Sequence, residues 1–112
     1  MILLMKDNIE APNETFAIDL PYAQLAAFCK RNAVRELALF GSALSQQFNA
    51  SSDIDLLVEF APGARIGFLD FARMQRELAA LLGRKVDLVP KAGLKSAIRS
   101  EVLESARVIY AQ

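Results

Sequence analysis

Residues 52–60 read SDIDLLVEF, and this stretch constrains the fold more than any other part of the chain. Side chains alternate between the two faces of an extended strand, so Asp53 and Asp55 project from one face. Ile54, Leu56, Val58 and Phe60 line the other face. The two aspartates have Cα atoms roughly 6.5 Å apart, and burying a carboxylate costs several kcal/mol unless a cation compensates it. The pattern therefore predicts a buried strand with a cation-binding site at its start.

The rest of the chain alternates amphipathic helices with short apolar strands. Helices are predicted over 21–32, 42–48, 68–83 and 96–107, from apolar spacing and from cap residues such as Ser42 and Gly83. Strands are predicted over 35–40, 53–60 and 85–89. The last helix is expected to turn an apolar stripe inward, made of Ile98, Val102, Leu103 and Ala106. This order predicts an α/β fold in which helices pack on a small sheet.

Composition and charge place the chain among compact globular proteins. It has 112 residues, 54% of them apolar and 23% charged, which suits a single domain. Residues 1–20 are predicted to form an N-terminal extension and residues 21–112 the domain. Basic and acidic residues both number 13, so the zero net charge argues against nonspecific binding of nucleic acid or anionic membranes. No stretch approaches the ~18 apolar residues that a membrane span needs, and we expect a cytoplasmic protein.

The chemistry open to the chain is limited by its residue types. Cys29 is the only cysteine, which excludes an internal disulfide, and there is no histidine, which excludes Ser–His nucleophile pairs and most zinc sites. Asp53 and Asp55 suit Mg²⁺, which takes one or two protein carboxylates and completes its shell with water and phosphate oxygens. Asp87, a single acid in the apolar strand KVDLV, is a third candidate ligand. Three carboxylates could hold two ions about 3.5–4 Å apart.

Gly41 and Ser42 follow the first predicted strand and suit an anion. A glycine lets the backbone approach a ligand closely, and a helix that begins at a serine offers free N–H groups to a terminal phosphate. Each motif alone is common, because Asp-x-Asp pairs and Gly-Ser dipeptides occur mostly in turns. Their joint order favours a site: strand, Gly-Ser, ten residues, Asp-x-Asp, helix, and then a strand with one aspartate.

This arrangement resembles the nucleotidyltransferase superfamily of the DNA polymerase β type, and in particular its minimal nucleotidyltransferase (MNT) domains. The resemblance rests on LFGS at 39–42, SDIDLLVEF at 52–60, GFLDFARMQRELAALLGRKVDLV at 67–89 and the closing helix. It implies a palm-like fold with a small mixed sheet and Mg²⁺-dependent transfer of AMP from ATP, with release of pyrophosphate. The family roles then fall to Gly41 and Ser42 as triphosphate binders and to Asp53, Asp55 and Asp87 as catalytic metal ligands.

The same resemblance implies a partner. Many MNT domains are antitoxins paired with a helical HEPN ribonuclease toxin, and a tyrosine hydroxyl of the toxin accepts the AMP. One departure concerns the phosphates, because relatives with a pattern like G-S-x-x-R-G carry a basic residue where this chain has Ser45 and Gln46. The residues that could replace this cation are Arg65, Arg84, Lys85 and Lys91.

Two alternatives to a protein adenylyltransferase stay open. A non-catalytic antitoxin with a vestigial nucleotide site would explain the missing basic residue. Transfer to a small molecule is less favoured, because the chain is too short for the extra domain that helps to build such an acceptor pocket. A homo-oligomer is also open, and the exposed faces of the helices at 21–32 and 96–107 are candidate contact surfaces.

Overall fold

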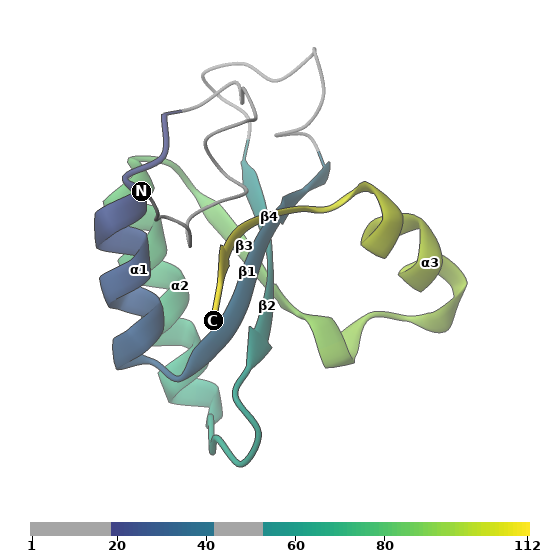
Figure 1. The fold of residues 1–112 in the computed structure, drawn as a ribbon, viewed down its shortest axis with the longest axis horizontal. Helices are drawn as coiled ribbons and strands as arrows, with labels where there is room; N and C mark the ends of the chain where they lie inside the picture. Colours follow the sequence, from purple (N-terminus) through teal and green to yellow (C-terminus); the bar gives the residue numbers. More distant parts are fainter. Residues whose placement is uncertain (1–18, 42–52) are drawn as a thin grey trace, which may run out of the picture.

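The computed structural model describes residues 19–41 and 53–112 of the chain (Figure 1). Its elements are α1 (Tyr22–Arg31), β1 (Val34–Phe40), β2 (Ile54–Phe60), α2 (Phe68–Leu82), β3 (Val86–Pro90), the 3₁₀ helix η4 (Lys91–Gly93), α3 (Ser96–Ser105) and β4 (Arg107–Ala111). The helix predicted over 42–48 and the predicted extension up to residue 18 lie outside the described residues. No described helix is long and apolar enough to cross a membrane.

The four strands form one mixed sheet in the order β3-β2-β1-β4. β1 pairs antiparallel with both β2 and β4, whereas β2 and β3 are parallel. A parallel pair needs a long crossover between its strands, and α2 provides it. The predicted α/β fold with a small mixed sheet is confirmed.

The hydrophobic core lies between the sheet and the helices α1 and α2, which cover one face together (Figure 1). The helices contribute Leu25, Phe28, Met74 and Leu78, all almost fully buried. α2 shows why the sequence forms this layer, because its apolar residues recur at three- and four-residue spacing. It ends at Gly83, whose φ of 67° closes the helix in the left-handed conformation. The predictions for both helices are confirmed.

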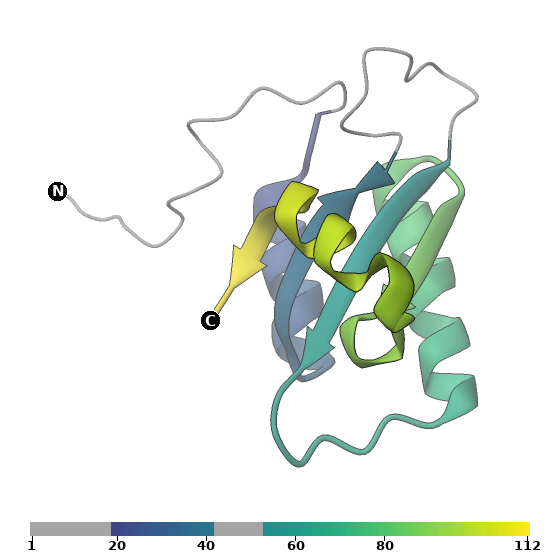
Figure 2. The same ribbon diagram turned by 90° about the vertical axis from the view of Figure 1, so that its right-hand side faces the viewer.

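The side-chain alternation predicted for the 53–60 strand is also confirmed. Ile54, Leu56 and Val58 of β2 are buried against the helices, so Asp55 projects from the opposite face. That opposite face also has an apolar centre, where Leu57 of β2 and its partner Ala38 of β1 are buried. The helix α3 crosses in front of this face (Figure 2).

The C-terminal segment differs from the prediction of one helix over 96–107. The helix α3 ends at Ser105, and the next residues form the unpredicted strand β4 along β1. Ser105 closes the helix, because its hydroxyl donates to the carbonyl oxygens of Glu101 and Val102 at 3.1 and 3.3 Å. The segment after it, RVIYA, is rich in β-branched and aromatic residues, which favour a strand.

The apolar stripe predicted for the last helix does not reach the core. None of the ten residues of α3 is buried, and Ile98 is 46% exposed. The helix therefore lies over the sheet without the tight packing that fixes α1 and α2. The predicted stripe is covered only in part, because Val102, Leu103 and Ala106 are half-buried and Ile98 is exposed.

Cys29 makes the stability of the fold sensitive to alkaline pH. Burial in α1 raises the pKa of its thiol from about 9 to about 12. The folded state therefore holds this proton more tightly than the unfolded state, and the free energy of unfolding is unaffected below about pH 9. It then falls as the pH rises towards 12, at about 1.4 kcal/mol for each pH unit. We expect urea-denaturation midpoints measured from pH 8 to 11 to decline, and the decline to be shallower in C29A. An equal slope in C29A would contradict this assignment.

Candidate active site

The predicted site residues lie at one edge of the sheet, at the upper ends of β1 and β2 in Figure 1. β1 ends there and is followed by Gly41, while β2 and β3 both begin there. Asp53 directly precedes β2, and Asp55 and Asp87 are the second residues of β2 and β3. Ser42, the other predicted phosphate-binding residue, lies outside the described residues.

The structure brings Asp55 and Asp87 side by side. They are paired residues of the two parallel strands, with Cα atoms about 4.8 Å apart across the sheet. Their neighbours Ile54 and Val86 are buried on the helix side, so both carboxylates project from the other face. Two like charges directly opposite each other on neighbouring strands repel. A cation between them would remove this repulsion.

Asp53 lies further towards the edge and is exposed. Within the two described ranges, no three acidic, cysteine or histidine side chains lie close enough together to hold a metal ion. The chain thus supplies an in-register pair of carboxylates, with Asp53 two residues before Asp55 on the same side of the strand. Metal binding by all three residues requires their carboxylates to move closer together.

The predicted burial of these carboxylates is wrong. Asp53 and Asp87 are exposed, and Asp55 is half-buried. The reason is that α1 and α2 cover only the opposite face of the sheet, and α3 does not seal this one. The case for a cation therefore rests on the spacing of the like charges and no longer on the cost of burying them.

Gly41 packs directly against Asp55. Its φ is 72°, in the left-handed region that favours glycine. A Cβ atom at this position would lie 3.2 Å from Cγ of Asp55 and would collide with its Oδ2. Gly41 was predicted to let the backbone approach a ligand closely. In this structure the group that lies against it is the carboxylate of Asp55. No signal in the sequence identifies this contact, because it depends on the pairing of Phe40 with Asp55.

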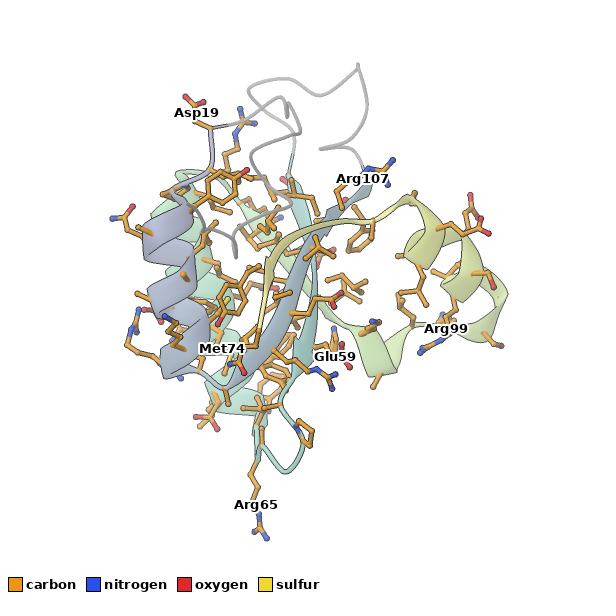
Figure 3. All side chains as sticks on the ribbon, in the orientation of Figure 1. Asp19, Glu59, Arg65, Met74, Arg99 and Arg107 are labelled. Carbon is orange, nitrogen blue, oxygen red and sulfur yellow. The ribbon has the colours of Figure 1, made fainter. Side chains whose placement is uncertain are left out.

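The structure separates the four basic residues that could face the phosphates. Arg65 lies in the loop after β2 and points away at the opposite end of the molecule (Figure 3). Lys91 follows β3, also away from the site, and its Nζ atom lies 3.4 Å from Glu59 and 3.9 Å from Glu36. Arg84 and Lys85 directly precede β3, at the same edge as the aspartates.

An apolar groove of about 390 Å³ lies at the other end of β2 and β3. Its lining includes Phe60, Phe71 and Pro90, and at its rim Phe68 is 85% exposed. No titratable side chain lines it. The groove therefore offers no group for acid–base or metal chemistry, and the edge with the aspartates is the better candidate.

The donor set at this edge fits Mg²⁺. Carboxylate oxygens are the hard ligands that this ion prefers, and it needs only one or two of them. The contact of Asp55 with Gly41 fixes one of these side chains against the backbone. A family model described as a nucleotidyltransferase domain matches residues 23–109, which run from α1 into β4. The chain belongs to the nucleotidyltransferase domain family.

Similar proteins support this membership. This nucleotidyltransferase domain is similar to the protein adenylyltransferase MntA of Thermococcus cleftensis, with 41% identity over 81 residues. The match covers 72% of this chain and 78% of the relative. It is 35% identical to a minimal nucleotidyltransferase of known structure, with a TM-score of 0.63 and with 76% of this chain and 85% of that one covered.

A third likeness concerns the fold of this nucleotidyltransferase domain. It is similar to a chain in the complex of a tri-AMPylated HEPN toxin of Shewanella oneidensis with its MNT antitoxin, with a TM-score of 0.60. The two chains are 19% identical, and the match covers 81% of this chain and 70% of that one. At 19% identity, this likeness shows that the two chains share a fold, and it shows nothing further.

The contact between Gly41 and Asp55 can be tested with a matched pair of glycines. Gly41 and Gly63 both have positive φ, 72° and 84°, but nothing lies within 4 Å of a Cβ built on Gly63. Both G41A and G63A should lose about 1 kcal/mol from backbone strain, and G41A should lose more because of the collision. We expect urea unfolding to show that D55A suppresses the extra loss in the G41A background. Equal losses for G41A and G63A, without coupling to Asp55, would contradict the contact.

Proposed function

We propose that this chain is a Mg²⁺- and ATP-dependent adenylyltransferase that transfers AMP to a hydroxyl group of a partner protein. The observation that carries the proposal is the in-register pair Asp55 and Asp87 beside Gly41, at the open edge of the sheet. Its support from similarity is the 41% identity to a protein adenylyltransferase. A pair of carboxylates at this edge suits phosphoryl chemistry, in which charge neutralisation and positioning supply most of the catalysis.

The proposed roles of the residues follow from their positions. Asp53, Asp55 and Asp87, with their carboxylates drawn together, would hold Mg²⁺, which when bound supplies charge neutralisation for the triphosphate. The acceptor oxygen forms a bond to the α-phosphorus, the bond between this phosphorus and the bridging oxygen breaks, and pyrophosphate leaves. The acceptor's proton passes to a carboxylate, and we propose Asp87, which is exposed, for this role. Gly41 and Ser42 are proposed to face the phosphates.

The acceptor is proposed to be a tyrosine hydroxyl of a HEPN toxin, with this chain as the antitoxin. Support comes from the solved complex of the same fold, in which an MNT antitoxin is bound to an AMPylated HEPN toxin. The exposure of Asp53 and Asp87 agrees with an acceptor that arrives from another protein. The described residues include no second domain that could form an acceptor pocket.

A non-catalytic antitoxin is the second candidate. It is favoured by the spacing of the acidic residues, because no three of the described ones lie close enough for a metal. In that case the chain would neutralise its partner by binding alone, and the nucleotide site would be vestigial.

Labelled ATP distinguishes these functions. We expect a purified HEPN toxin, incubated with this protein, Mg²⁺ and labelled ATP, to retain label from the α-phosphate of ATP and none from the γ-phosphate. D53N/D55N should lower the rate about 100-fold or more, because it removes two charged metal ligands. The control D70N makes the same chemical change at the start of α2, where an amide oxygen can still accept the 3.0 Å hydrogen bond from Gly67. Retention of the γ label alone would indicate a kinase.

The stability of the same double variant separates a functional from a structural role. Without Mg²⁺, the removal of two like charges beside Asp87 should leave the melting temperature unchanged or raise it. A large fall in the melting temperature of D53N/D55N would indicate that the pair is structural. If this variant still protects cells from the toxin, the non-catalytic alternative is correct.

A further inference from the structure

We infer that Lys85 binds the polyphosphate of the nucleotide and supplies a positive charge that the segment after Gly41 and Ser42 lacks, since Ser45 and Gln46 stand there. The inference rests on the proposed function, because it assigns a further residue to the same site. It names the ligand's chemistry as the β- and γ-phosphates of a nucleoside triphosphate. Four observations carry it: the backbone position of Lys85, the side to which it projects, its lack of a partner among the described residues and the placement of the other basic residues.

The backbone of Lys85 lies against the start of β2. Its carbonyl oxygen accepts a hydrogen bond of 2.9 Å from the N–H of Ile54, the residue between the two aspartates. The ladder pairs Ile54 with Val86 and Asp55 with Asp87. One step further back along the same ladder, Lys85 falls beside Asp53. The lysine is thus next to the proposed metal ligands on both strands.

The side chain of Lys85 is on the face that carries the carboxylates. Along residues 85–88, exposure alternates: Lys85 and Asp87 are exposed, while Val86 and Leu88 are buried. This alternation is that of an extended chain, so Lys85 and Asp87 project from the same side of the sheet. Together with Asp53 and Asp55 they make a block of three carboxylates and one ammonium group.

Within the part of the chain that the structure describes, the Lys85 side chain forms no ion pair or hydrogen bond. The contrast with Lys91 is direct, because that ammonium group is held by Glu36 and Glu59. Arg84, the neighbour of Lys85, is half-buried and takes part in another interaction. Of the two basic residues that precede β3, Lys85 is therefore the one whose side chain has no partner among the described residues.

A polyphosphate is a suitable ligand for the ammonium group of Lys85. Lysine is a compact charge with three donors on a flexible stem, and it is a common binder of phosphate. Mg²⁺ held by the aspartates would be shared with the phosphates of the nucleotide, and these would then lie within reach of Lys85. The two other candidates, Arg65 and Lys91, lie at the opposite end of the strands. Of the four basic candidates, only the two that precede β3, Arg84 and Lys85, lie at the edge where these phosphates would bind.

The test is the affinity for nucleotides, measured by isothermal titration calorimetry in the presence of Mg²⁺ and without any acceptor protein. K85M keeps the apolar stem and removes the charge, so we expect it to weaken ATP binding about 10-fold or more. The binding of AMP should change less than about twofold, because AMP lacks the β- and γ-phosphates. K85R should keep most of the ATP affinity. K95A, which removes an exposed lysine beyond the other end of β3, should bind ATP as the wild type does.

The outcomes separate this inference from the proposed function. If the wild type binds ATP and K85M binds it equally well, the Lys85 inference is wrong and the proposed function stands. Equal losses for ATP and AMP would also overturn the contact with the outer phosphates. If the wild type itself binds no ATP, the proposed function fails and this inference fails with it. The melting temperatures of the ligand-free variants are measured alongside. If K85M is misfolded, K85Q is measured in its place, with the same loss of ATP affinity expected.

Discussion

The candidate site depends on the parallel pairing of β2 with β3. This register sets Asp55 opposite Asp87 and extends to Lys85 and Ile54 through a backbone hydrogen bond. β3 is an edge strand, and its outward N–H at Leu88 donates at 2.9 Å to Oε1 of Gln75 in α2. The crossover helix therefore connects the two strands and also fixes the edge strand from its free side. A shift of one residue in this register would turn Asp87 towards the hydrophobic core.

The two faces of the sheet have different roles: one packs the hydrophobic core, and the other carries the candidate site residues. One face is sealed by α1 and α2, and it holds almost all the large buried side chains. The other has an apolar centre and carboxylates at both ends. At the end away from Gly41, Lys91 pairs with Glu36 and Glu59 and neutralises part of their charge. At the Gly41 end, the proposed Mg²⁺ and nucleotide would neutralise the charge of Asp55 and Asp87.

Local patterns were sufficient to predict most of the elements. The spacing of Phe71, Met74 and Leu78, followed by Gly83, predicts α2 because it reflects a period that the chain carries within itself. The alternation in SDIDLLVEF predicts β2 and the side on which its aspartates lie. The strand β4 was missed because Val102 and Ala106 continue a helical spacing up to its start, and because its stability comes from pairing with the distant β1.

The site itself could be predicted only in part. Its residue types and their order along the chain indicate the chemistry, and Asp55, Asp87 and Gly41 do lie at one edge. Their contacts could not be predicted from the sequence. The contact of Gly41 with Asp55, for example, depends on the register of β1 with β2. The exposure of Asp53 and Asp87 was not predictable either, because it depends on how loosely α3 covers the second face. Such long-range relations are set by the packing of whole elements.

The helix α3 has a consequence for the motions of the molecule. It has no buried residue, yet it is attached at both ends, by Arg99 to the carbonyl oxygen of Lys91 at 3.1 Å and by β4 to β1. With so few buried contacts, its backbone hydrogen bonds are expected to open and exchange with solvent more readily than those of the sheet. For the same reason, the chain between η4 and β4 is where length and sequence can change at little cost to the rest of the structure.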